Sequence, residues 1–391
     1  MRMGGAHFGQ KTGQARTQSA VNAVDHSIHS DRIPSAIMNT SLRCDIFCTV
    51  VDNFGDAAVC WRLASQLADD FGWQVRLWID DPQPLYRLAP DAPRSSVDVR
   101  RWEKSFADTA PADIVIETFA CELPPNYVAA MASRTTQPVW LNLEYLSAED
   151  WVSGCHGLPS PHPRLPLTKH FFFPGFDSNT GGLLRERDYE KRRRVFNAKA
   201  FRQEFLLGDP PPASLTISLF SYVNPALPAL LAAWARSDTP IQVLCPGSTE
   251  PRQQIGRLEL VPLPFLPQQR YDELLWTCDL NFVRGEDSFI RAQWAAKPLV
   301  WQIYPQTENL HLQKLDAFIA AFGKVDAGHT LSIRTMAAFW HAWNGDGTLD
   351  WPAFSSALPA MRQHTQIWTN HLAAHTDLAT NLVQFCLARL K

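Results

Sequence analysis

The chain has 391 residues, of which 46% are hydrophobic, with 14 Trp and 22 Phe. This composition predicts about two domains with substantial apolar cores and excludes a wholly disordered chain. The formal net charge of -3 argues against nucleic acid as the main partner, and no apolar run is long enough to cross a membrane. The eight cysteines form no Cys-x-x-Cys pair, which favours free buried thiols in a cytoplasmic protein.

Residues 1–40 are rich in Gly, Gln, Ser, Thr and His and show no sustained hydrophobic period. They also lack the continuous apolar core of a secretory signal. We therefore expect a disordered extension, or an over-long start with the true start near Met38.

The first ordered unit combines a strand, a tight turn and a helix. The apolar run Cys44–Val51 predicts the strand, and Val59, Leu63 and Leu67 have the spacing of the helix. Between them, Asp52 and Asp56 flank a turn that contains Gly55. Because ligands bind at the carboxyl edge of a parallel sheet, these acids are candidate site residues. The alternative for Asp56, favoured when the turn is taken alone, is that it only caps the helix.

Further strands follow at 74–79, 113–117 and 137–143, separated by segments of helical length. This alternation predicts a parallel sheet and a Rossmann-like first domain over 41–184. We expect another helix to begin within 144–151, with Ser147 as its cap. The glycine pair Gly181–Gly182 either lines a diphosphate or simply turns the chain.

A second alternating series begins after the charged segment 185–202, which predicts a solvated helix face. Its strands are expected at 215–220, 241–244, 258–263, 278–283 and 297–303. They predict a second Rossmann-like domain over 185–360. The last segment, 361–391, is expected to form a C-terminal helix that packs back toward the first domain.

The most informative stretch is Cys278–Phe289, which runs from a strand through Gly285 into a helix. Glu286, Asp287 and Ser288 therefore lie at a helix N-terminus, where unpaired backbone N–H groups suit a phosphate. Two acids beside Arg284 are unexpected for a site that binds only an anion. The alternative is that Asp287 or Ser288 is an ordinary N-cap.

Two Rossmann-like domains facing across a cleft describe a GT-B glycosyltransferase. The nucleotide would lie on the second domain and the acceptor on the first. No G-x-G-x-x-G fingerprint, Walker A motif or G-x-S-x-G elbow is present. Nor does an Asp-x-Asp end a strand, so we expect no metal, and backbone N–H groups with Arg284 would offset the leaving group's charge. The pair His371 and His375 has no evident third ligand.

Four motifs occur together and in order along the chain: Asp52–Asp56, Leu141–Glu149, Phe171–Phe176 and Asn281–Ser288. On these motifs the chain resembles the EarP family, the protein-arginine rhamnosyltransferases that modify bacterial translation elongation factor P. The resemblance extends from about Arg43 to the C-terminus. One departure is Asp56-Ala57-Ala58, where the family often has a bulkier residue.

The resemblance implies transfer of L-rhamnose from dTDP-β-L-rhamnose to one arginine of elongation factor P, with inversion and without metal or another cofactor. It implies that Asp56 activates the acceptor, that Asp52 supports it and that Glu286 is a second essential acid. Phe265 would stack on thymine and Gln268 would recognise the edge of the base. The other implied donor-binding residues are Asn53, Phe54, Gly55, Tyr222, Arg284, Asp287, Ser288 and Tyr304.

The residue types suit this chemistry, because a guanidinium with a pKa near ~13.8 is a poor nucleophile while its charge is delocalised. Carboxylates can bind it in a bidentate manner, localise its charge and accept its proton. Two other functions stay open: a GT-B transferase with a lipid or small glycoside as acceptor, and a non-enzymatic nucleotide-sugar binding module. The binding module would not need Asp52, Asp56 and Glu286 together.

Overall fold

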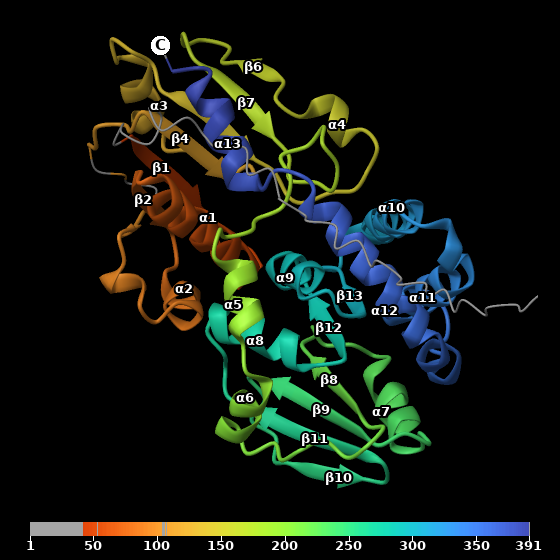
Figure 1. Ribbon diagram of the computed structural model, residues 1–391. Helices are drawn as coiled ribbons and strands as arrows, with labels where there is room; N and C mark the ends of the chain where they lie inside the picture. Colours follow the sequence, from red (N-terminus) through yellow and green to blue (C-terminus); the bar gives the residue numbers. More distant parts are fainter. Residues whose placement is uncertain (1–41, 53, 104–105, 107, 391) are drawn as a thin grey trace, which may run out of the picture. The chain divides into compact units, whose positions relative to one another are not determined.

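The computed structural model describes residues 42–52, 54–103, 106 and 108–390. The expected disordered extension at 1–40 lies outside these residues, and so does Asn53. The described chain contains two separate sheets, each covered by helices (Figure 1).

The first sheet has seven strands in the order β3-β2-β1-β4-β5-β7-β6. Its strands are parallel except for β6, which pairs antiparallel with β7. The strands are β1 (Arg43–Cys48), β2 (Gln74–Ile79), β3 (Asp98–Arg101), β4 (Ile114–Thr118), β5 (Val139–Leu143), β6 (Pro159–Pro161) and β7 (Thr168–Phe172). The connecting helices are α1 (Gly55–Phe71), α2 (Gln83–Leu88), η2 (Ala92–Arg94), α3 (Pro125–Ala132) and α4 (Val152–Cys155).

The second sheet has six strands in the order β10-β11-β9-β8-β12-β13, and only β10 is antiparallel. The strands are β8 (Leu215–Leu219), β9 (Ile241–Pro246), β10 (Gln253–Ile255), β11 (Leu258–Leu263), β12 (Leu280–Arg284) and β13 (Leu299–Gln302). Helices α7 (Leu227–Ala235), α8 (Gln268–Thr277) and α9 (Asp287–Ala295) connect them. The segment between the sheets forms α5 (Tyr189–Val195) and α6 (Ala198–Glu204).

The part of the chain around the first sheet is called the first half, and the part around the second sheet is called the second half. Each half is held together by apolar strands that are buried on both faces. Every residue of β4, β5 and β13 is buried, as a parallel sheet covered on both sides requires. In the second half, Phe289 of α9 stacks on Trp301 of β13 with ring centroids 3.7 Å apart, and Phe318 packs edge-on against Phe289. These contacts fix α9, which carries the predicted site motif, against its sheet.

The C-terminal segment is helical but longer and more divided than expected. It contains η3 (Thr307–Asn309), α10 (Leu310–Lys324), η4 (Ala327–His329), α11 (Thr330–Trp343), α12 (Trp351–Ala373) and α13 (Leu378–Leu387). The expectation of one helix over 361–391 was wrong at its start and in its continuity. Asp350 caps α12 through Ala353 N, and Asp377 caps α13 through Thr380 N, so each helix has its own start signal.

Helix α13 packs on the first half (Figure 1). The ring of Phe385 lies edge-on to Phe172 of β7, with centroids 5.5 Å apart, and Leu378 N donates to Leu183 O. Gly181 and Gly182 allow this approach, because a Cβ at Gly182 would lie 2.4 Å from Thr376 O. Neither glycine lines the two pockets described below, so in this structure the pair serves packing.

The helix expected to begin within 144–151 is absent from that range. The backbone stays irregular as far as 149, and only the short α4 follows. Ser147 does not cap a helix; its Oγ donates to Glu149 Oε2 and accepts from Glu149 N in a local turn. Leu146 N donates to Glu286 Oε2 at 2.9 Å in the second half, and this long-range bond holds the segment out of a helix.

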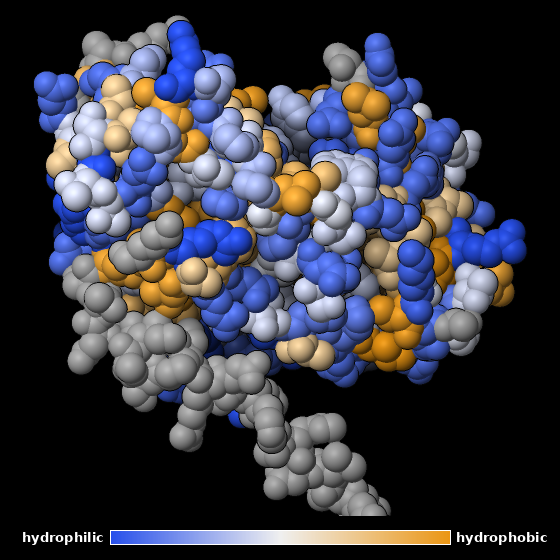
Figure 2. All heavy atoms as spheres, turned by 90° about the horizontal axis from the view of Figure 1, so that it is seen from above, coloured by the Kyte–Doolittle hydropathy of each residue, from blue (hydrophilic) through white to orange (hydrophobic). Residues whose placement is uncertain are grey.

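Among the described residues, no helix is long and apolar enough to span a bilayer. Hydrophobic side chains on the face in Figure 2 lie in small separate groups among hydrophilic ones. All eight cysteines are free thiols, and six of them are buried.

Candidate active site

The topology brings polar turns from both sheets together. In the first sheet, the strand order reverses between β1 and β4, and the turn after β1 holds Asp52 and Asp56. In the second sheet, it reverses between β8 and β12, which are followed by Tyr222 and by Glu286. Such switch points are where open α/β sheets bind ligands.

Asp56 is buried in the first turn of α1, but it does not cap that helix. Its Oδ2 accepts hydrogen bonds from Val51 N and Asp52 N, each at 2.8 Å, and the hydroxyl of Tyr145 donates to Oδ1 at 3.4 Å. Burial raises the pKa of Asp56, although these hydrogen bonds oppose the rise. The capping interpretation of Asp56 is therefore wrong, because its carboxyl is held by the turn before α1 and by Tyr145 instead.

Asp52 links the two halves directly. The hydroxyl of Tyr222 donates to its Oδ2 at 2.6 Å. A Cβ at Gly55 would lie 2.7 Å from that same oxygen, and one at Gly285 would lie 2.9 Å from it. Gly285 also has a φ of +60°, which favours glycine. Both glycines therefore make room for the Asp52 carboxylate.

Glu286 is held by one oxygen only. Its Oε2 accepts from Leu146 N, whereas its Oε1 is buried and has no hydrogen-bond partner among the described residues. Burial raises the pKa of Glu286 to about 8, and the nearby charge of Asp56 adds to the rise. Oε1 is thus a buried oxygen without a partner among the described residues, and when the carboxyl ionises it can bind a cationic group that enters the site.

Two adjoining pockets share Asp52, Gly55 and Glu286 in their walls. The first also contains most of the predicted donor-binding residues: Phe54, Tyr222, Phe265, Gln268, Arg284, Asp287 and Ser288. The second, of about 260 Å³, is lined by Asp56, Tyr145, Phe119, Tyr304 and Lys314 among others. The three shared residues therefore lie where a ligand in the first pocket would meet a ligand in the second.

The first pocket is narrow, at about 60 Å³. Ligand pockets generally measure roughly 300–1,000 Å³, so a nucleotide sugar requires its walls to move apart. Phe265 lies against Phe54 of the first half, with centroids 4.9 Å apart, and the guanidinium of Arg87 lies 4.6 Å from the Phe265 ring. Separation of these two rings would open a flat apolar slot of the kind that stacks on a base.

Arg284 and Ser288 form the polar end of the first pocket. The guanidinium of Arg284 lies over the rings of Phe220 and Tyr222 and donates to Ser221 O at 3.1 Å. Ser288 Oγ accepts from Arg284 N at 3.0 Å and also donates back to Arg284 O. Ser288 is thus no N-cap, since it holds the strand-to-helix turn; α9 begins at Asp287 with Glu286 at its N-cap and no side-chain cap.

The side chains of Asp287 and Gln268, in the second half, form hydrogen bonds with residues of the first half. Arg62 of α1 donates through Nε to Asp287 Oδ1 at 2.7 Å, and Gln268 Nε2 donates to Ala58 O at 3.0 Å. Arg62 also pairs with Glu186 and Asp272. Asp287 therefore contributes to the first pocket with a carboxylate that already has a cationic partner.

The ion network around Arg62 extends into both halves. Arg291 is fully buried, binds both oxygens of Asp272 and donates to Glu186. Arg192, expected on a solvated helix face, also lies within 3.5 Å of Glu186 and Asp272. Sequence patterns did not indicate this network, because its members are widely separated in the chain.

The structure adds Phe119 and Lys314 to the residues expected at the site. Tyr145 lies at the cleft, as its place after the strand 137–143 predicts, and its ring stacks on Phe119 with centroids 4.2 Å apart. Phe119 has a φ of +57°, an uncommon conformation for a non-glycine residue that is often found at functional sites. Lys314 of α10 lines the same pocket. Phe119 directly follows strand β4. This position at the carboxyl end of a strand is the feature of the sequence that could have identified it as a site residue.

A family model described as elongation-factor P (EF-P) rhamnosyltransferase EarP matches residues 44–387. The chain belongs to the EarP family. A protein-arginine rhamnosyltransferase of Pseudomonas putida is 46% identical to this EarP-family chain over 375 residues, which cover 87% of this chain and 97% of the relative. The protein of the same name from Pseudomonas aeruginosa is 44% identical over 374 residues, covering 87% and 98%. The predicted family and its glycosyltransferase class are thereby confirmed.

Solved structures support the GT-B fold. A structure described as the structural basis for EarP-mediated arginine glycosylation of translation elongation factor EF-P has a TM-score of 0.62 and 32% identity, and the match covers 89% of this chain and all of that one. An Arabidopsis thaliana protein complexed with UDP-L-rhamnose has a TM-score of 0.51 at 9% identity, covering 90% of this chain and 100% of that one, a likeness of fold alone. The predicted GT-B architecture is confirmed.

Proposed function

We propose that this EarP-family enzyme transfers L-rhamnose from dTDP-β-L-rhamnose to an arginine side chain of elongation factor P, with inversion and without a metal ion. Asp52 and Glu286 line both adjoining pockets and Asp56 lines the second, and this grouping of three acids carries the proposal. A nucleotide sugar would occupy the first pocket, and the acceptor arginine would enter the second. The relatives' names supply the arginine acceptor and the sugar.

In the proposed reaction, a guanidinium nitrogen attacks the anomeric carbon, and the bond from that carbon to the diphosphate oxygen breaks. Asp56 accepts the proton from the guanidinium as the new C–N bond forms. Glu286 binds the cationic group through its free oxygen and localises its charge. The position of Asp56 on the first half supports attack from the face opposite the diphosphate, and such a single displacement would invert the anomeric centre.

The leaving diphosphate requires positive charge. Arg284 and the N-terminus of α9 lie at the polar end of the first pocket, where they would offset the negative charge as it develops. The thymine base would stack on Phe265, with Gln268 at its edge. Because the acceptor is a translation factor, the proposed reaction belongs in the cytoplasm.

The test is the intact mass of purified elongation factor P after incubation with this protein and dTDP-β-L-rhamnose in EDTA. We expect a gain of one deoxyhexose, mapped to an arginine. Asp56→Asn should abolish turnover while the donor still binds by calorimetry. Donor binding without any mass gain would overturn the proposed acceptor and favour a GT-B transferase that acts on another molecule. Full turnover by D56N would overturn the proposed base.

A further inference from the structure

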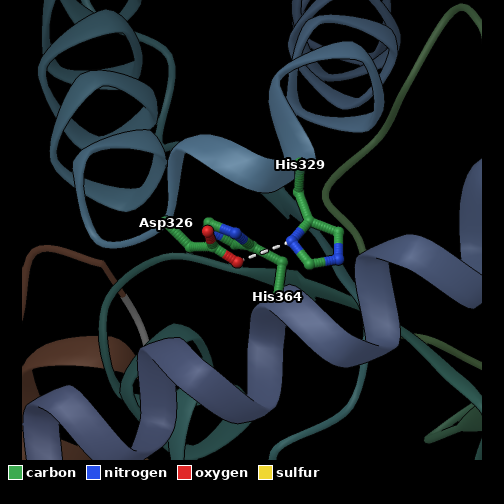
Figure 3. Close-up of side chains that lie close together, drawn as sticks. All are labelled: Asp326, His329 and His364. Carbon is green, nitrogen blue, oxygen red and sulfur yellow. Dashed lines mark hydrogen bonds and ion pairs between the residues drawn. The ribbon is translucent and has the colours of Figure 1, made fainter.

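Asp326, His329 and His364 gather where the connection between α10 and α11 crosses α12 (Figure 3). Each offers a ligand atom, and these atoms lie within 4.8 Å of one another. Asp326 Oδ1 accepts from Gly328 N, and Oδ2 lies 2.7 Å from His329 Nδ1. The second ring nitrogen of His329, Nε2, lies 3.2 Å from Gln363 Oε1. These local contacts would account for Asp326 and His329 without any ligand, and a metal ion would have to replace one of the two contacts of His329.

That explanation leaves His364 unaccounted for. Its side chain is fully buried, and Nε2 lies 2.7 Å from the carbonyl oxygen of Phe322. The other nitrogen, Nδ1, is buried and has no partner among the described residues. A histidine that donates one N–H to a backbone carbonyl presents a lone pair on its second nitrogen, the arrangement common to metal-binding histidines.

We propose that Asp326, His329 and His364 bind a divalent transition-metal ion of the Zn²⁺ type. Two imidazoles and one carboxylate suit zinc, whereas Ca²⁺ and Mg²⁺ prefer oxygen ligands. Zinc–ligand bonds of about 2.0–2.2 Å place tetrahedral ligand atoms about 3.4 Å apart. Atoms already within 4.8 Å therefore need only small side-chain rotations. Asp326 and His329 remain partly exposed, so solvent can supply the fourth ligand.

The ion would act as a structural link within the second half. It would tie the α10–α11 connection to α12, whose residues Thr369 and Trp368 bond to Gln293 of α9. None of the three ligands lines either pocket of the candidate active site. The site is therefore independent of the proposed transfer reaction, and its test does not use catalytic activity.

The experiment titrates Zn²⁺ into EDTA-stripped, full-length protein by calorimetry and records the unfolding temperature with and without Zn²⁺. We expect one high-affinity equivalent and a higher unfolding temperature in its presence. Asp326→Asn and His329→Gln change partly exposed side chains and should each weaken binding by roughly 10-fold or more. The matched control is His371→Gln, which removes a histidine elsewhere on α12 and should leave binding unchanged.

Co²⁺ spectroscopy tests the ligand set directly. A tetrahedral spectrum without thiolate charge-transfer bands is expected, because no cysteine belongs to the site. Thiolate bands would place the ion on a cysteine and overturn the proposal. The proposal also fails if the stripped protein binds no Zn²⁺, or if D326N and H329Q bind it as tightly as the unmodified chain.

Discussion

The hydroxyl of Tyr222, from the second half, donates a 2.6 Å hydrogen bond to Oδ2 of Asp52 in the first half. This bond joins the turns at the two switch points, and it orients one of the two acids that line both pockets. Burial raises the pKa of Tyr222, with Asp52 as a further cause, so the hydroxyl keeps its proton and remains the donor.

Replacement of Tyr222 by Phe should therefore lower turnover more than stability. The variant keeps the ring and the backbone bond from Tyr222 N to Gln302, but it leaves Asp52 without its donor. We expect a loss of about 1.5–3 kcal/mol in transition-state stabilisation, or roughly 10- to 150-fold in turnover. Steady-state rates and urea unfolding measure the two effects. Tyr86→Phe, on an exposed ring outside both pockets, is the control, and full activity in Y222F would contradict the proposed role of Asp52.

The pH dependence of kcat/KM for the acceptor should reveal the ionisation of Glu286. Its pKa of about 8 means that the free enzyme holds this carboxyl neutral below that pH and ionised above it. Because a carboxylate binds guanidinium and a neutral acid does not, kcat/KM for the acceptor should rise with pH and level off above about 8. The acceptor arginine cannot cause this plateau, since its own pKa is near ~13.8.

Glu286→Gln is the matched control for that profile. Glutamine has nearly the same shape but cannot ionise, so the variant should be slow and should lose the rise below pH 8. A wild-type profile that is flat between pH 6 and 9 would show that Glu286 is not the titrating group that controls acceptor binding.

Removal of the Phe265 ring should weaken donor binding without changing which acceptor the enzyme modifies. Stacking of a base on an aromatic ring contributes about 1–3 kcal/mol, so Phe265→Ala should raise the donor dissociation constant roughly 5- to 150-fold. Calorimetry with dTDP measures this change, and F265Y, which retains the ring, should bind nearly normally. Equal affinities for F265A and the unmodified chain would place the base elsewhere.

Arg62 should matter far more to stability than an exposed arginine does. It is buried among Asp287, Asp272 and Glu186, and its loss leaves buried carboxylates with fewer partners. We expect Arg62→Met to cost about 3–5 kcal/mol of unfolding free energy. Arg252→Met, which breaks a pair between partly exposed side chains with Glu259, should cost about 0–1 kcal/mol. Urea unfolding of both variants measures the two losses of unfolding free energy. Similar losses for R62M and R252M would mean that the network is not a major stabilising feature.

The sequence by itself determined the two parallel sheets and the turns that carry the site. Short apolar runs followed by Gly55 or Gly285 and a helical period are local signals, and parallel strands place their carboxyl ends at one edge. These signals are sufficient to assign Asp52, Asp56 and Glu286 to that edge. The roles of the donor-binding residues came from family resemblance and stay predictions.

Only the tertiary structure decided what joins the halves. Arg62, Asp272 and Glu186 are far apart in the chain, and each alone resembles an ordinary charged residue on a helix or loop. The segment 144–151 has a helical pattern, yet Leu146 N bonds to Glu286 instead. The pKa of Glu286 likewise depends on burial that both halves create. Local patterns report a residue's chain neighbours, whereas long-range bonds and desolvation arise only when distant segments pack together.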